Sequence, residues 1–184
     1  MGVGLFGYNV SEKYKCLWIA PSRTGSRGTA EILSRYDFKY NGKIVYSFNQ
    51  DNYCHFTSDL SPFEEYKIIC NARNPYGRVL SHYRNYNTEQ ITFQEYVMSR
   101  RWDGLKLEEP ILSKKPDYLL RLEHLKEDFT KIPFILDRLT EKQLDTYLQH
   151  GKELDVWEQY YDQHMKEIVY KSFENHFIFW NYKK

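Results

Sequence analysis

The sequence is poor in cysteine, and its few cysteines lie far apart. Its 184 residues include three, Cys16, Cys54 and Cys70, an odd number without a C-x-x-C pair. A structural zinc site or a disulfide framework needs more cysteines at closer spacing, so we expect neither. Cys16 and Cys70 lie in apolar runs and are predicted to be buried thiols. Free thiols are typical of a reducing compartment, and we expect a cytoplasmic protein.

The chain also lacks a long apolar run and an excess of charge of one sign. No window approaches the roughly 18 apolar residues of a membrane span. Residues 1–15 have neither the basic nor the apolar region of a signal peptide. The 26 Lys and Arg balance 25 Asp and Glu, whereas nucleic-acid-binding domains usually carry a strongly basic face. We therefore expect no membrane or nucleic-acid partner, and any anion site must be local.

What the chain does contain is a regular alternation of apolar runs and helical patterns. Apolar runs predict strands at residues 15–20, 43–48, 67–72 and 118–123. Helical spacing predicts helices at residues 29–36, 92–101, 133–139 and 154–173, and another ending near residue 86. Thr92 and Glu95 have the spacing of a capping box. The alternation indicates one α/β domain over residues 1–184, its core at about 15–182, with a central mostly parallel sheet flanked by helices.

Two loops that follow strands are rich in anion-binding chemistry. The first, Ser22-Arg23-Thr24-Gly25-Ser26-Arg27-Gly28, offers glycines for a tight turn, two hydroxyls, two guanidinium groups and the start of a helix. The second begins with Arg73-Asn74-Pro75, and Ser81 follows eight residues after Arg73. Ligands bind at the carboxyl ends of parallel strands, so we expect these two loops to form one phosphate or sulfate site.

These residues resemble the motifs of the sulfotransferase family that uses 3′-phosphoadenosine-5′-phosphosulfate (PAPS). The first loop is similar to the family's phosphosulfate loop, P-[KR]-[ST]-G-[ST], except that Ser22 stands where proline is common and Arg23 where many members have lysine. Residues 25–33 also resemble the G-T-R-A-L-L-E-M-L run of heparan glucosaminyl sulfotransferases. Arg73 and Ser81 match the family's R-[ND]-P motif and its serine without a gap. Residues 118–129 and 168–182 resemble later family blocks more loosely.

The resemblance implies a P-loop-like three-layer fold and specific site residues. Arg73 and Ser81 would grip the 3′-phosphate of PAPS or of its product PAP, while residues 22–28 hold the phosphosulfate. Arg23 would correspond to the catalytic lysine, and as an arginine it would act electrostatically. No metal is implied. The acceptor, a hydroxyl or amine on a small molecule, stays open, and the resemblance favours carbohydrate.

The general base has two candidates. His55 lies upstream of the strand at 67–72, where many sulfotransferases place a basic histidine, and imidazole titrates near neutrality. Glu31, six residues after Gly25, matches the glutamate base of the glucosaminyl sulfotransferases. Both stay open. His82, beside Ser81, is expected to face solvent or pack on its neighbours.

Two rival functions are compatible with the same strand–loop–helix pattern. A nucleotide or nucleoside kinase would need the G-x-x-x-x-G-K-[ST] loop, which the chain lacks. A non-catalytic module that binds PAP or another anion would keep the loops without turnover. The choice of ligand distinguishes them, since a kinase responds to ATP with Mg²⁺ and a sulfotransferase to PAP without metal.

Overall fold

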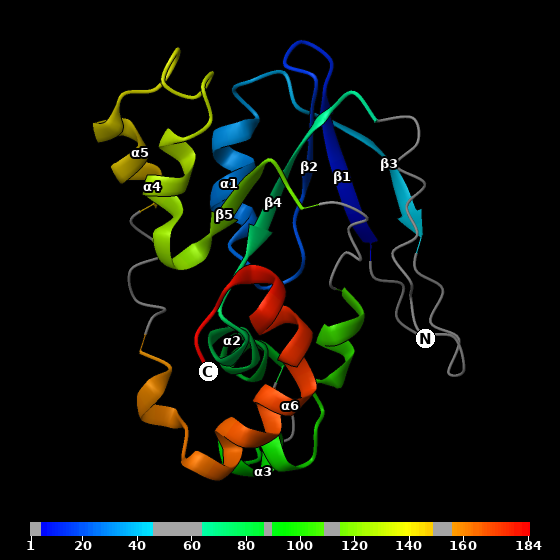
Figure 1. Cartoon of the computed structure of the whole chain (residues 1–184), viewed down its shortest axis with the longest axis vertical. Coiled ribbons are helices and arrows are strands. Elements are labelled where there is room, and N and C mark those ends of the chain that lie inside the picture. Colours follow the sequence, from blue (N-terminus) through cyan, green and yellow to red (C-terminus); the bar gives the residue numbers. More distant parts are fainter. Residues whose placement is uncertain (1–4, 46–63, 87–89, 109–114, 149–155) are drawn as a thin grey trace.

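A mixed β-sheet organises the chain (Figure 1). The computed structural model describes residues 5–45, 64–86, 90–108, 115–148 and 156–184. Across the sheet the strands follow the order β3-β1-β2-β4-β5. Their bounds are Leu5–Ser11 (β1), Cys16–Ile19 (β2), Lys39–Val45 (β3), Lys67–Ala72 (β4) and Tyr118–Arg121 (β5). β1 is antiparallel to β2 and β3, while β2, β4 and β5 pair in parallel.

The expected α/β class and mostly parallel sheet are confirmed, but the antiparallel part was not predicted. Because β3 is antiparallel to β1, it points the same way as β2, so β1 alone among these five strands runs against the others. An antiparallel strand on an otherwise parallel sheet is common. The sequence of β1, LFGYNVS, has no continuous apolar run, and this explains why its strand signal is weak.

β2 and β4 form the centre of the sheet because their apolar runs suit strands that are covered on both faces. All four residues of β2 are buried, as are the five residues of β4 after Lys67. Successive side chains of a strand point to opposite faces, so Trp18 belongs to one hydrophobic cluster and its neighbour Leu17 to another.

Cys16 and Cys70 are both buried free thiols, as the sequence predicts. Burial raises the pKa of the Cys16 thiol to about 11, so it stays protonated at neutral pH. Cys54 lies outside the described residues.

Helices cover the two faces of the sheet differently. On one face, α1 (Ser26–Leu33), α4 (Leu125–Thr130) and α5 (Glu141–Leu148) pack over a cluster that includes Trp18 and Ile69. On the other face, Trp180 at the end of α6 (Gln163–Trp180) packs on Leu17 and Ile68. The central sheet therefore has helical residues on both faces, as expected.

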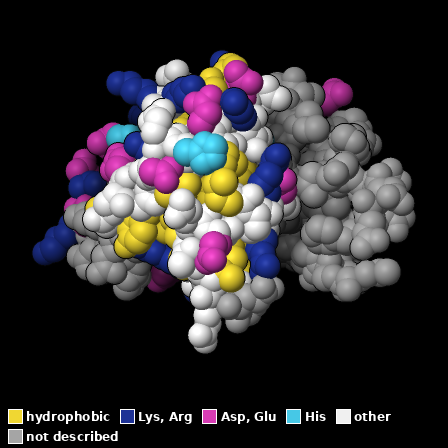
Figure 2. Space-filling view, turned by 90° about the horizontal axis from the view of Figure 1, so that it is seen from below, with side chains coloured by type: hydrophobic (Ala, Val, Ile, Leu, Met, Phe, Trp, Pro, Cys, Tyr) yellow, Lys and Arg dark blue, Asp and Glu magenta, His cyan; other side chains and the backbone are white. Residues whose placement is uncertain are grey.

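A second helical group lies below the sheet in Figure 1, where β4 leads into α2 (Pro75–Tyr86). Here α2, α3 (Phe93–Met98) and α6 share an aromatic cluster. Short 3₁₀ helices lie at Asp103–Glu108 (η2), Leu122–His124 (η3) and Glu158–Tyr160 (η5). Seen from below, hydrophobic side chains and charges of both signs are interspersed (Figure 2). Within the described ranges, no helix combines the length and apolarity needed to cross a bilayer.

Several predicted helix boundaries are wrong, for identifiable reasons. Residues 133–139 form turns rather than a helix. Their apolar side chains, Phe134 and Ile135, are buried in the same hydrophobic cluster as residues of α1. The next helix, α5, was not predicted. The last helix begins at Gln163 instead of residue 154, because the Asp162 carboxylate caps it by accepting from the Met165 N–H at 2.7 Å. Phe173, where the predicted helix ends, has non-helical backbone angles (φ −115°, ψ 19°) and forms a kink, after which α6 continues to Trp180.

Other local predictions are confirmed. The Thr92 capping box is complete: its hydroxyl accepts from the Glu95 N–H at 3.2 Å, and the Glu95 carboxylate accepts from the Thr92 N–H at 2.8 Å. The strand predicted at 118–123 ends at Arg121 and continues as η3. The strand predicted at 43–48 overlaps β3, and residues 46–48 lie outside the described residues.

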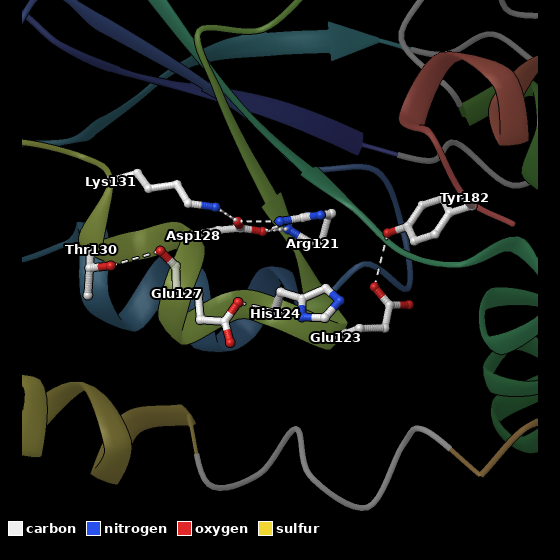
Figure 3. Close-up of polar contacts among 8 residues, drawn as sticks. All are labelled: Arg121, Glu123, His124, Glu127, Asp128, Thr130, Lys131 and Tyr182. Carbon is white, nitrogen blue, oxygen red and sulfur yellow. Dashed lines mark hydrogen bonds and ion pairs between the residues drawn. The ribbon is translucent and has the colours of Figure 1, made fainter.

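A buried carboxylate joins the end of β5 to α4 (Figure 3). Asp128, only 2% exposed, accepts from the Arg121 backbone N–H at 3.0 Å, from Nε and Nη2 of the Arg121 guanidinium at 2.9 and 2.8 Å, and from Lys131 at 2.7 Å. Burial raises the pKa of Asp128, but these hydrogen bonds lower it more, so the net pKa lies below its ordinary 3.8. The ionised carboxylate therefore stabilises the fold.

Replacing Asp128 by Asn should lower the free energy of unfolding by about 2 kcal/mol at pH 7, since several hydrogen bonds to a charged group are weakened. The folded pKa is depressed, so this stabilisation is present above pH 3.8 and is lost as the pH falls through the folded value. Urea unfolding at pH 7, 5 and 3 measures it. Asp137→Asn, at an exposed position, is the control and should change stability by less than about 0.5 kcal/mol. A pH-independent difference between wild type and Asp128→Asn would contradict the assignment.

Candidate functional site

The two predicted anion loops meet at one edge of the sheet. β2 and β4 pair in parallel with Ile19 opposite Cys70, so their carboxyl ends lie side by side. β2 leads through residues 20–25 into α1, and β4 leads through Arg73 and Asn74 into α2. The expected juxtaposition of the loops is therefore present in the fold.

The first loop turns sharply, with two residues in the left-handed region. Gly25 has φ of 85° and Arg23 has φ of 67°. The Thr24 side chain is buried, and its hydroxyl donates to the Pro21 carbonyl at 2.6 Å, which stabilises the turn from inside. Gly25 caps α1, whose first turn is formed by Ser26, Arg27 and Gly28. The free N–H groups of such a turn attract anions.

Two buried arginines, one in the second loop and one in α2, bind the backbone of the first loop. Arg73, 5% exposed, donates from Nη1 to the Arg23 carbonyl at 3.3 Å. Arg78, 1% exposed, donates from Nε to the Ser22 carbonyl at 2.9 Å. Both guanidinium groups thus lie against the first loop, and they place fixed positive charge beneath it. A guanidinium carries five N–H donors, so binding a carbonyl and binding a phosphate are compatible.

Asn71 at the end of β4 connects three elements of the site. Its amide oxygen accepts from the Trp18 indole at 2.7 Å. Its amide nitrogen donates to the Thr24 carbonyl at 3.0 Å and to the Thr29 hydroxyl at 2.9 Å. These bonds fix β2, the first loop and α1 relative to β4. Because Asn71 is fully buried, water cannot bind its amide, and the loss of any of these bonds would leave a buried polar group without a partner.

Ser81 lies on the side of α2 that faces Arg73. A Cβ atom placed at Gly77 would lie 3.1 Å from Arg73 Nε, so the guanidinium passes directly over Gly77. Residues four apart share a helix face, and Ser81 therefore follows Gly77 on this side. Ser81 is half-buried. Ser81 therefore lies one helical turn beyond Gly77, on the side of α2 that the Arg73 guanidinium contacts.

Arg23 reaches toward α2 and lies over an aromatic ring. Its Cζ is 4.5 Å from the centroid of Tyr86, and the His82 ring is 4.6 Å from the same centroid. His82 is half-buried and its Nδ1 is hydrogen-bonded to the Tyr96 hydroxyl. Burial lowers the pKa of His82, and together with the charges of Arg23 and Arg78 it brings the pKa to about 4. His82 is thus neutral at pH 7 and packs on its neighbours, one of its two expected settings.

The structure describes only one of the two candidate bases. Glu31 is exposed on α1, outside the bonds that connect the loops. His55 lies outside the described residues.

A carboxylate that follows β5 in the chain also supports the site. Glu123, in η3, accepts from the Asn74 N–H at 2.6 Å and from the Tyr182 hydroxyl at 3.0 Å (Figure 3). The Asn74 side chain in turn accepts from the Tyr76 N–H at 3.0 Å and starts α2. Asn74 is therefore oriented from both sides, and this orientation sets the direction in which Arg73 leaves the strand.

Sequence reasoning missed Asn71 and Arg78 as parts of the site. Both lie in the segment KIICNARNPYGRVLSHYR. A polar residue within an otherwise apolar strand, as at Asn71, was an available signal because buried polar groups need partners. Arg78 gave no comparable signal, since an arginine within a helix is ordinarily exposed.

Other places in the described residues offer less chemistry. A cavity of about 200 Å³ lies beside β5, away from both loops. It is lined by Asp117, Tyr118, Leu119, Arg121, Asp128 and Lys131, and Asp128 already accepts from Arg121 and Lys131. Among the described side chains, no group of three or more His, Cys, Asp or Glu is placed to hold a metal ion.

Comparison with protein-family models, curated proteins and solved structures gives no match for this chain.

Gly25→Ala should destabilise the protein by about 1–3 kcal/mol, because an added Cβ at φ of 85° is strained and would lie 2.6 Å from Leu122 Cδ1. Urea unfolding measures the change. Gly104→Ala is the matched control, since no heavy atom lies within 4 Å of its added Cβ, and it should cost less than about 0.5 kcal/mol. Equal effects of the two substitutions would show that the loop does not depend on this glycine.

Proposed function

We propose that the chain is a PAPS-dependent sulfotransferase with a P-loop-like three-layer fold. The observation that carries the proposal is the direct contact between the two loop regions: Arg73, of the R-N-P segment, and Arg78, in α2 directly after it, donate to the backbone of residues 22–23. The same two loops carry the sequence motifs that resemble the family. Motif and geometry therefore agree on one place in the molecule.

The chemistry of the site fits a nucleotide with two separate anionic groups, a 3′-phosphate and a 5′-phosphosulfate. Arg23, Arg73 and the first turn of α1 supply cationic and N–H groups from two sides. Arg73 and Ser81 share one side of α2 and would bind the 3′-phosphate bidentately and through a hydroxyl. The loop at residues 22–28 would bind the phosphosulfate. The net charge of the whole sequence is only +1, so an anion would be attracted mainly by this local cluster of positive charge.

Arg23 would stabilise the charge that develops on the leaving phosphate. Preorganised cations are most effective where charge appears in the transition state. Arg23 meets this requirement because its carbonyl is held by Arg73 and its guanidinium by Tyr86. An arginine does not donate its proton at neutral pH, so its contribution is electrostatic. PAPS would supply the sulfuryl group, and the acceptor would be a hydroxyl or amine, with carbohydrate as the favoured class.

The rival functions differ in what they require of the same loop. A nucleoside-triphosphate loop needs lysine after its second glycine. Here Thr29 follows Gly28, and it is buried with its hydroxyl donating to the Gly25 carbonyl and accepting from Asn71. This position is therefore used for folding, which disfavours a kinase. A non-catalytic PAP-binding module has the same binding residues and is distinguished by turnover.

The test of the donor is thermal stabilisation by PAP. PAP at a hundredfold excess over its dissociation constant should stabilise the native state by about 2.7 kcal/mol, whereas ATP with Mg²⁺ should give little shift. Ser81→Ala should weaken the effect and Arg73→Ala should abolish it. Arg138→Ala is the control, since Arg138 donates to the Arg35 carbonyl outside both loops, and it should respond to PAP like wild type.

Each alternative result has a definite meaning. No shift with PAP in the folded wild type would refute the donor assignment. A shift with ATP and Mg²⁺ alone would support the kinase. Arg73 is buried, so its removal can destabilise the fold as well as weaken PAP binding. Ser81 is only half-buried, so the effect of Ser81→Ala on PAP binding tests the 3′-phosphate site independently.

The general base is tested by comparing His55→Ala with Glu31→Gln. The substitution that removes the base should lower kcat by about 10²- to 10⁴-fold while the dissociation constant of PAP changes less than about twofold. The other substitution should leave kcat near the wild-type value. Single-turnover sulfuryl transfer to a mixed panel of hydroxyl and amine acceptors measures both. If neither substitution lowers kcat, both candidates are wrong.

A further inference from the structure

Tyr86, the last residue of α2, is an exposed aromatic side chain at the edge of the site. It is 56% exposed, unusual for a ring of this size on the described surface. Arg23 lies over its ring, with 4.5 Å between Cζ and the centroid. A guanidinium over a tyrosine ring is attracted by the ring's electron-rich face. The ring thus contacts the one side chain of the first loop to which we give an electrostatic role in catalysis.

The ring is itself held in place by the helices beneath it. The His82 ring lies 4.6 Å from Tyr86, with 43° between the two planes. His82 Nδ1 is hydrogen-bonded to the hydroxyl of Tyr96, a buried residue of α3. Tyr96 packs in the aromatic cluster shared by α2, α3 and α6. A continuous series of contacts therefore runs from the core through His82 and Tyr86 to Arg23.

Arg23 needs such support at its distal end. Its backbone has φ of 67°, and its carbonyl accepts from Arg73 at 3.3 Å, so the main chain is fixed. An arginine side chain nevertheless has several rotatable bonds, and ordering it costs conformational entropy. An aromatic ring at 4.5 Å limits this freedom before a ligand binds, and preorganisation raises the affinity for that ligand.

We propose that Tyr86 is a positioning residue that holds the Arg23 guanidinium beside the first loop for an incoming phosphate or sulfate group. Its aromatic face, not its hydroxyl, performs this role. The inference rests on the proposed function only for the identity of the nucleotide, because any small phosphate anion at the loop would use the same contact.

The substitutions Tyr86→Phe and Tyr86→Leu separate the face from the hydroxyl. Tyr86→Leu should weaken the binding of inorganic pyrophosphate by about three- to tenfold, the range expected for a partly exposed cation–π contact. Tyr86→Phe should stay within about twofold of wild type. Tyr160→Leu is the matched control, because Tyr160 is also exposed and has Arg84 over its ring at 5.0 Å but lies in η5, outside both loops.

A double-mutant cycle with Arg23→Ala shows whether Tyr86 acts through Arg23. If it does, Tyr86→Leu should have no further effect on pyrophosphate affinity in the Arg23→Ala background. The side-chain Nε–H resonance of Arg23 gives a direct reading of the contact. It should show a ring-current shift in wild type and Tyr86→Phe, and lose it in Tyr86→Leu.

Additive effects of the two substitutions, or the absence of the ring-current shift in wild type, would overturn the proposal. A second titration with PAP keeps this result separate from the donor assignment. Coupled binding of pyrophosphate without any binding of PAP would leave Tyr86 as the positioning residue and refute the donor. Coupled binding of both ligands would support the two together.

Discussion

The buried amide of Asn71 is the interaction on which the arrangement of the site depends. It lies at the point where the two central strands end, and it bonds to β2, to the first loop and to α1 at once. An amide in an apolar interior must have its partners, because a lost hydrogen bond there leaves an unsatisfied polar group. The loop can therefore take only a backbone path that presents the Thr24 carbonyl to Asn71. Every other contact between the loops builds on this path.

The two buried arginines follow from the same path. On this path the carbonyl of Arg23 accepts from Arg73, and the carbonyl of Ser22 accepts from Arg78. Burying two cations close together is costly unless their hydrogen bonds are made. This cost is lowered by any anion that binds above the loop. The proposed site would therefore favour anionic ligands as a class, whatever their identity.

The central strands and their loops were predictable from sequence because the apolar runs of β2 and β4 are continuous and end at polar turns. The pairing of Arg73 with Ser81 came from the resemblance to the sulfotransferase motif and stays a prediction. The parts that were missed share one physical cause, since they depend on tertiary contacts. Asn71 and Arg78 are polar residues whose partners lie about 50 residues away in the chain. The turns at residues 133–139 show helical spacing only because Phe134 and Ile135 fill a gap in the core.

The bonds that join the two loops to each other and to η3 are distant in sequence. The Asn71–Thr24, Arg73–Arg23, Arg78–Ser22 and Asn74–Glu123 contacts span 47, 50, 56 and 49 residues. Contacts of this kind close large loops and raise the contact order, so they form slowly compared with helices and hairpins. We therefore expect partly folded chains to form the helices before the two loops meet. If the proposed anion site exists, it therefore belongs to the completed fold, because the loops that would form it meet only when these distant contacts are made.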